Sequence, residues 1–142
     1  MIKYSSLRKL DNFGGRMKDK NELFLIVDDE PDMCWALEHI LKKNAFLSKR
    51  ALTGQEALNL MKVDRFRLAF LDAKLPDMEG LDLARRIRKR DPAVPIVMIS
   101  GYFYRDDDAI QKAEAEGLIS SFIEKPFDYD EILKAIEIAN SS

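Results

Sequence analysis

The stretch LFLIVDDEPD, residues 23–32, contains the structural unit from which the rest of the fold can be worked out. Its continuous apolar run, Leu23–Val27, is typical of a strand buried on both faces of a parallel sheet. Asp28 and Asp29 follow the run, and Pro31 then favours the first turn of a helix because its φ angle is already helical. The stretch therefore predicts a buried strand, a short acidic loop and a helix.

The same succession of an apolar run and an amphipathic segment recurs along the chain. Further strands are predicted at 46–51, 68–71, 95–99 and 119–123, with helices at 53–61, 81–90, 106–116 and 128–139. Thr53 is the expected cap of the second helix, and Gly117 the expected end of the fourth. Strand and helix thus alternate five times, which predicts an α/β fold with a doubly wound, five-stranded parallel sheet.

Charge is distributed unevenly along the 142 residues, a length that suits one domain. Residues 1–20 carry six Lys or Arg and two Asp, so this segment is basic, and the rest of the chain has a net charge of −6. We expect residues 1–20 to form a basic, flexible N-terminal extension, with a docking arm as the alternative, and residues 21–142 to form the domain. The acidic body argues against nucleic acid as a direct partner.

The chain has no feature that predicts a membrane partner or a membrane location. Its apolar runs are much shorter than the roughly 18 residues that a transmembrane helix needs, and its N-terminus lacks the apolar stretch of a signal peptide. The single cysteine, Cys34, cannot form an internal disulfide, which fits a reducing compartment. We therefore expect a cytoplasmic protein.

Polar side chains follow four of the five predicted strands: Asp28 and Asp29, Asp72, Ser100 and Lys125. In doubly wound sheets, ligands bind beyond the carboxyl ends of the strands, so these side chains are expected at one edge of the sheet. Each has a structural alternative, because the aspartates could cap helices and Lys125 could belong to a surface turn. Their joint placement at strand ends favours a site.

Three carboxylates at one edge would repel one another unless a cation lay among them. Mg²⁺ is such a cation, since it takes oxygen ligands and keeps several waters when it binds carboxylates and phosphate. Lys125 adds a positive charge suited to a phosphate, and Ser100 adds a hydroxyl donor. In that setting Asp72 could attack phosphorus and form an aspartyl phosphate, a reaction that depends mainly on positioning and charge neutralisation.

Four stretches give the chain its resemblance to a known family: VDDEPD at 27–32, FLDAKLPDMEG at 70–80, MISGY at 98–102 and FIEKPF at 122–127. In this order, at the ends of these strands, they resemble the CheY-like receiver domain of response regulators in two-component signalling. The resemblance covers about residues 22–140 and implies a (βα)5 flavodoxin-like fold.

The resemblance implies which residues would accept the phosphoryl group and hold the metal. Asp72 would be the phosphoacceptor. Asp29, Asp72 and the backbone carbonyl of Lys74 would ligate Mg²⁺, with Asp28 acting through water.

It also implies the residues that would respond to phosphorylation. Ser100 would hydrogen-bond a phosphoryl oxygen, and Lys125 would pair with the phosphoryl group. The Lys125–Pro126 peptide bond is expected to be cis. Phe122 takes the position of the family's aromatic switch residue, with a plain core aromatic as the alternative.

The activity implied is phosphorelay signal transduction: Mg²⁺-dependent acceptance of a phosphoryl group from a sensor histidine kinase or phosphotransfer protein. The chain would be a phosphoacceptor switch with self-catalysed phosphorylation and dephosphorylation, not an enzyme with a separate substrate. Pulling Ser100 toward the new oxygens would let Phe122 turn inward and change the surface of the fourth helix, fifth strand and fifth helix. That surface would contact an unknown downstream protein, and a phosphorylation-dependent dimer is left open.

Two alternatives have to be weighed. One is a binding module of receiver fold that works without phosphorylation. The other is a small phosphatase with an aspartyl-phosphate intermediate, but such enzymes typically carry a second acid two positions beyond the nucleophile, where this chain has Lys74.

The chain departs from the family at two places. Ser100 and Lys125 lie 25 positions apart, longer than usual, with the extra residues expected within 101–108 and 117–121. Lys74 and Tyr102 occupy positions where the family varies its dephosphorylation rate. Because a lysine beside a bulky aromatic ring would obstruct water, we predict a long-lived phosphoryl group.

The remaining distinctive residues have structural interpretations. The basic run on the third helix, Arg85, Arg86, Arg88, Lys89 and Arg90, is expected to form a solvated face. Trp35 and His39 are expected outside the apolar face of the first helix, with partner contact as the alternative, and Cys34 is expected to be partly buried.

Overall fold

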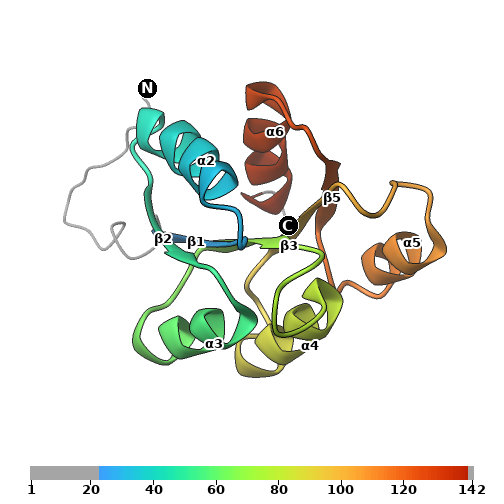
Figure 1. Ribbon diagram of the computed structural model, residues 1–142. Helices are drawn as coiled ribbons and strands as arrows, with labels where there is room; N and C mark the ends of the chain where they lie inside the picture. Colours follow the sequence, from blue (N-terminus) through green and yellow to red (C-terminus); the bar gives the residue numbers. More distant parts are fainter. Residues whose placement is uncertain (1–22, 141–142) are drawn as a thin grey trace.

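Five parallel strands form one sheet in the computed structural model, which describes residues 23–140 (Figure 1). The strands are β1 (Leu23–Val27), β2 (Leu47–Ala51), β3 (Leu68–Asp72), β4 (Ile96–Ser100) and β5 (Ser121–Glu124). The helices are α2 (Pro31–Lys43), α3 (Gly54–Val63), α4 (Gly80–Arg90), α5 (Asp108–Ala115) and α6 (Tyr129–Asn140). The predicted doubly wound α/β fold is confirmed. The expected extension over residues 1–20 lies outside the described residues.

Different helices cover the two faces of the sheet. α2 and α6 lie on one face, and α3, α4 and α5 lie on the other (Figure 1). Because side chains alternate along a strand, β1 sends Phe24 and Ile26 into the core beneath α2 and α6, and Leu25 and Val27 into the opposite core. All four are at most 1% exposed, which explains why this run is continuously apolar.

The strand order reverses at β1, which is the topological switch point of the sheet. The order is β2-β1-β3-β4-β5, so the chain crosses from one side of β1 to the other between β2 and β3. Val27 lies opposite Leu71 in the register of β1 and β3. The next residues, Asp28 and Asp72, therefore leave neighbouring strands at the same edge, where ligands bind in doubly wound folds.

The predicted helix ends are confirmed where local side chains determine them. Thr53 caps α3 by accepting the backbone N–H of Glu56 on its side chain at 3.1 Å, and Gly117 closes the turn after α5 with a φ of +76°. The start of α5 was predicted too early, because the Asp107 carboxylate accepts the N–H of Tyr104 at 2.9 Å and holds residues 104–107 in a separate turn. None of the helices in the described part of the chain is long and apolar enough to cross a bilayer.

The start of the fifth strand was also predicted too early, at residue 119 instead of Ser121. Leu118 and Ile119 both donate their N–H groups to the Ala113 carbonyl, at 2.9 and 3.3 Å, and so belong to the turn that closes α5. Ile119 is nevertheless only 2% exposed. Its apolar character reflects burial in the core, not membership of the strand.

Candidate functional site

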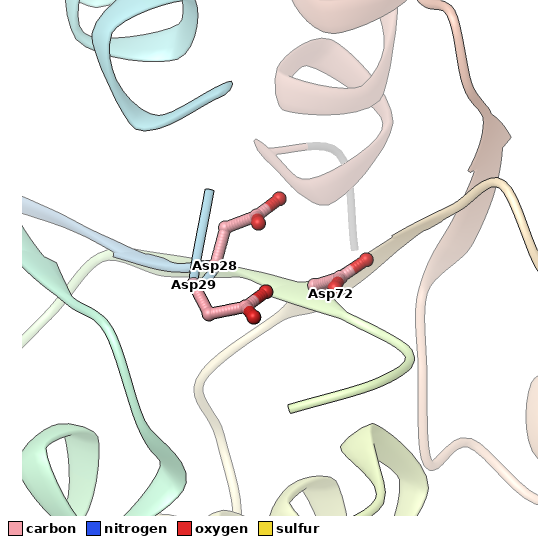
Figure 2. Close-up of side chains that lie close together, drawn as sticks. All are labelled: Asp28, Asp29 and Asp72. Carbon is pink, nitrogen blue, oxygen red and sulfur yellow. The ribbon is translucent and has the colours of Figure 1, made fainter. Parts of the chain in front are cut away.

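Three carboxylates meet at the carboxyl edge of the sheet. Asp28 and Asp29 follow β1 and Asp72 ends β3, and ligand oxygens of the three lie within 4.8 Å of one another (Figure 2). Asp28 is 4% exposed and Asp72 is 9% exposed, whereas Asp29 is open to solvent. The site is therefore a cluster of acids that is closed at its base and accessible from one side.

The cluster is not explained by helix capping alone. Asp28 does accept the N–H of Glu30 at 2.9 Å, just ahead of α2. Asp72, however, does not cap the helix that follows it, because the capping position of α4 is Glu79. Helix capping thus accounts for one oxygen of Asp28 and for neither Asp29 nor Asp72.

Lys125 is the cation that the structure places among these acids. Its ammonium lies 3.0 Å from Asp28 Oδ2 and 3.2 Å from Asp72 Oδ1. A third carboxylate, that of Glu30, pairs with the same ammonium at 3.1 Å and was not predicted from the sequence. The backbone N–H of Lys125 bonds to the Ser100 carbonyl at 2.9 Å, which helps to fix its position. The Lys125–Pro126 bond is cis, as expected.

Burial and mutual repulsion raise the pKa of the acids. Desolvation is the main cause for Asp72, the negative charge of Asp28 adds to it, and together they outweigh Lys125 and raise its pKa to about 6. Desolvation likewise raises the pKa of Asp28. Burial pulls the pKa of Lys125 down, but the hydrogen bond and charge of Asp28 outweigh this and raise it above its ordinary value. The ammonium is therefore charged, yet one positive charge does not neutralise the cluster.

Ser100, the last residue of β4, is 1% exposed and already has hydrogen-bond partners. Its hydroxyl oxygen accepts the backbone N–H of Tyr102 at 2.8 Å and that of Phe103 at 3.0 Å. The hydroxyl thus holds the start of the loop between β4 and α5. Any movement of this side chain would therefore alter the two hydrogen bonds that hold the loop.

This geometry can be compared with proteins of known family. Residues 24–137 match the sequence profile of the response regulator receiver domain. The chain belongs to this family. Receiver domains of two-component systems act as phosphoacceptor switches, and they interact with histidine kinases or phosphotransfer proteins.

Solved structures support the same assignment. A CheY-like receiver domain from Methanospirillum hungatei is 27% identical, with a TM-score of 0.74 and coverage of 85% of this chain and 98% of that one. TrrA of Thermotoga maritima, solved in complex with Mg(2+)-BeF, is 25% identical, with a TM-score of 0.73 and coverage of 83% and 98%.

Curated relatives differ greatly in length. Sporulation initiation phosphotransferase F of Bacillus subtilis is 32% identical over 117 residues, which are 82% of this chain and 92% of that protein. The response regulator protein PilR of Pseudomonas aeruginosa is 36% identical over 115 residues, but these are only 25% of its length. This receiver domain therefore matches nearly all of the first relative and about a quarter of the second.

The donor set of this receiver domain fits Mg²⁺, the ion that receiver domains typically bind. Its three clustered side chains offer only carboxylate oxygens, which suit a hard cation. The raised pKa of Asp72 shows that the cluster would gain from further positive charge. The two backbone hydrogen bonds that close the following loop use the carbonyls of Met78 and Ala73, and neither of them uses that of Lys74, the fourth predicted ligand.

Lys74 and Tyr102, the two residues predicted to flank the site, contact each other. The ammonium of Lys74 lies 4.2 Å from the centroid of the Tyr102 ring. The same ammonium lies 3.1 Å from Glu79, whose hydrogen bond raises the pKa of Lys74. Sequence reasoning missed Glu79, although the five-residue spacing within one loop could have indicated the pair.

Phe122, the predicted switch residue, is 1% exposed. The guanidinium carbon of Arg105 lies 6.0 Å from its ring centroid, and a shallow surface hollow beside the ring is lined by Arg105, Lys134 and Ile138. The ring is thus already inside the protein. The expected inward turn would therefore carry Phe122 from one buried position to another, not from solvent to the core.

Two structural expectations need correction. Four members of the basic run on α4 are exposed as predicted, but the guanidinium of Arg88 is half-buried and donates to the carbonyls of Pro92 and Leu118 at 3.1 and 3.0 Å. Cys34 is fully buried, not partly, because it packs in the core beneath α2 and α6, and its thiol donates to the Asp28 carbonyl at 3.3 Å. Burial raises the pKa of the Cys34 thiol to about 11.

The prediction for Trp35 and His39 is confirmed. Both lie on the exposed side of α2, and their rings stack with centroids 5.2 Å apart and planes inclined by 13°. Trp35 is 62% exposed. The pair contributes nothing to the core and stays a candidate for partner contact.

Proposed function

We propose that this receiver domain accepts a phosphoryl group on Asp72 from a histidine kinase or phosphotransfer protein, in a reaction that depends on Mg²⁺. One observation carries the proposal: the buried carboxylate of Asp72 lies 3.2 Å from Lys125 within a cluster of three acids at the switch point of the sheet. A nucleophile, a cation for the phosphoryl oxygens and oxygen ligands for a metal are thus close together.

In the proposed transfer, a carboxylate oxygen of Asp72 attacks phosphorus. The bond from phosphorus to the donor's imidazole nitrogen breaks, and its electron pair stays on that nitrogen. Before the ion binds, the pKa of Asp72 is raised to about 6, so its carboxylate is largely ionised near pH 7. Lys125 exchanges part of its pairing with the acids for a phosphoryl oxygen. Asp29, Asp72 and the Lys74 carbonyl would hold Mg²⁺, with Asp28 acting through water, and the ion would supply positive charge that offsets the negative charge of the transferring group.

The proposed response begins at Ser100. The new phosphoryl oxygens are strong acceptors, and they attract the hydroxyl whose oxygen now holds Tyr102 and Phe103. This movement opens space next to β5. Phe122, which is paired with Met98 of β4, then moves into that space. The surface of α5, β5 and α6 then changes for a downstream protein or for a second copy of the chain.

The relatives support a place in a phosphorelay. The chain covers 92% of a protein named as a phosphotransferase, which favours phosphoryl acceptance as its own activity and not only as part of a larger regulator. Coverage of only 25% of PilR means that the rest of that regulator is no guide to this chain. We place the proposed relay in the cytoplasm, with protein partners and neither nucleic acid nor membrane as a direct partner.

The test is chemical phosphorylation. Wild-type protein incubated with Mg²⁺ and acetyl phosphate or phosphoramidate is expected to gain the mass of one phosphoryl group. Asp72→Asn should gain none, whereas Asp82→Asn, which changes an exposed acid on α4, should behave as wild type. Equal labelling of the wild type and Asp72→Asn would refute the assignment.

The same experiment separates the two alternatives. A wild type that gains no phosphoryl group with Mg²⁺ and still binds a partner protein would be a binding module that works without phosphorylation. Multiple turnover of small phosphate esters, with no lasting adduct, would indicate a phosphatase.

A further inference from the structure

The carboxylate of Asp77 binds the start of a helix that is far from it in the sequence. Its two oxygens accept the backbone N–H groups of Gly54 at 2.9 Å and Gln55 at 3.0 Å, the first two residues of α3. These N–H groups have no partner within the helix itself. The hydrogen bond from Gly54 is the main cause of the lowered pKa of Asp77, so the carboxylate is ionised when it makes these contacts.

Thr53, and not Asp77, occupies the capping position of α3. Thr53 accepts the N–H of Glu56 at 3.1 Å, and the Glu56 carboxylate accepts the N–H of Leu52, the residue before the cap, at 2.9 Å. Asp77 adds a connection from another part of the chain, the loop between β3 and α4. The connection therefore fixes the loop at least as much as it fixes the helix.

Steric contact strengthens the same connection. Met78 packs against the first residue of α3 so closely that a Cβ atom added to Gly54 would lie 2.5 Å from its sulfur. A side chain at residue 54 would therefore require the Met78 side chain to move. Asp77 and Met78 thus hold the outer side of the loop against α3.

The inner side of the loop is closed by the backbone. Gly80 donates to the Ala73 carbonyl at 2.7 Å, and Leu75 donates to the Met78 carbonyl at 3.2 Å. A Cβ atom at Gly80 would overlap the carbonyl oxygen of Asp72, so the two ends of the loop lie in direct contact. Lys74 lies between these closures, two residues after Asp72, and its position depends on both sides of the loop.

We infer that Asp77 is a positioning residue for the metal ligands: by binding α3 it fixes the loop from which the Lys74 carbonyl reaches Mg²⁺ beside Asp72. The inference rests on the proposed function, since it assumes that Mg²⁺ binds there. Residues that orient ligands without touching the metal affect affinity strongly, typically by about 10- to 100-fold. Asp77 acts through a single backbone ligand, so about tenfold is the expected effect of its loss.

Isothermal titration with Mg²⁺ tests this with a matched control. Asp91 also accepts two backbone N–H groups, those of Ala93 and Val94 at 3.0 and 3.2 Å, but it does so at the amino edge of the sheet. Asp77→Ala and Asp91→Ala should therefore lose similar stability in denaturant. Only Asp77→Ala should bind Mg²⁺ about tenfold more weakly. Equal Mg²⁺ affinity in both variants, or an equal loss in both, would overturn the inference.

A second measurement uses the unmodified protein and does not depend on a variant that folds. Coupling between two sites is reciprocal. If the contact between Asp77 and α3 raises the affinity for Mg²⁺, bound Mg²⁺ must in turn strengthen that contact. Amide exchange at Gly54 and Gln55 should slow on addition of Mg²⁺ by more than exchange at Ala93 and Val94. The same change at both pairs would overturn the inference. A wild type that binds no Mg²⁺ would instead refute the proposed function.

Discussion

The ammonium of Lys74 lies over the ring of Tyr102, 4.2 Å from its centroid. One residue comes from the loop after β3 and the other from the loop after β4. The pair therefore joins the loops that follow β3 and β4, the strands that end in Asp72 and Ser100. If Asp72 is phosphorylated as proposed, we expect this pair to hinder the water that hydrolyses the aspartyl phosphate.

The first prediction is that this contact slows loss of the phosphoryl group. Tyr102→Ala is expected to speed dephosphorylation about two- to fivefold, because an exposed cation–π contact is worth about 0.5–1 kcal/mol. The rate is measured as decay of the phosphorylated mass after removal of the phosphodonor. Tyr104→Ala is the control, since Tyr104 is an exposed tyrosine of the same loop, with 65% of its surface accessible. Decay of the wild type within seconds would contradict the prediction.

The second prediction concerns Asp72 and pH. The pKa of Asp72 is about 6 in the folded chain, above its ordinary 3.8, so between these values the folded chain binds more protons than the unfolded one. Stability therefore falls as pH rises through that window, and the destabilisation is complete above it. Asp72→Asn is expected to raise the free energy of unfolding by about 1–2 kcal/mol near pH 7.5.

The pH series provides its own control. At about pH 4 wild-type Asp72 is largely protonated, so the gain from Asp72→Asn should be much smaller there than near pH 7.5. Urea unfolding at several pH values measures both quantities. A gain that does not change with pH would show that the ionised carboxylate is not its cause.

The third prediction concerns Lys125. Lys125→Met leaves Asp28, Glu30 and Asp72 without their shared cation, so we expect the free energy of unfolding to fall by about 1–3 kcal/mol and acetyl phosphate labelling to be lost. Lys112→Met, which removes an exposed pair with Glu116 at 4.0 Å, should cost less than about 0.5 kcal/mol and leave labelling unchanged. An equal loss of unfolding free energy in the two variants would mean that the buried ion pairs of Lys125 stabilise the fold no more than an exposed pair does.

Much of the fold could be predicted because its signals are local. The buried strands appear as short apolar runs, and Thr53 and Gly117 mark helix ends through their own side chain or backbone. The polar residues at the site were found because they interrupt or follow apolar runs. A carboxylate such as Asp72 at the end of a buried strand is costly unless a cation or ligand pairs with it, and its placement together with Asp28, Ser100 and Lys125 indicates a site.

Three of the missed features depend on where distant side chains come to lie, whereas Glu79 lies only five residues from its partner Lys74. Glu30 reaches Lys125 across 95 positions, and Asp77 reaches Gly54 across 23. Arg88 joins its own helix to Leu118, 30 positions away, although its neighbours in the basic run are exposed. No local period or propensity distinguishes these charged residues from others on the surface, so only the folded arrangement identifies them.

The last prediction concerns Ser100, whose hydroxyl oxygen accepts the N–H groups of Tyr102 and Phe103. Ser100→Ala leaves both without that acceptor and is expected to lower the free energy of unfolding by about 1–2 kcal/mol. Phosphorylation should still occur, because Asp72 and Lys125 are intact. Phosphorylation-induced chemical-shift changes in residues 101–107 should be large in the wild type and greatly reduced in the variant.

Ser120→Ala is the matched control for this prediction. The Ser120 hydroxyl donates to the Ile96 carbonyl at 3.1 Å, at the opposite edge of the sheet from Asp72. Its loss should cost some stability and leave the phosphorylation-induced shifts intact. Full shifts in Ser100→Ala would show that the loop responds to the phosphoryl group by a route that bypasses this hydroxyl, since the only change made is removal of its oxygen.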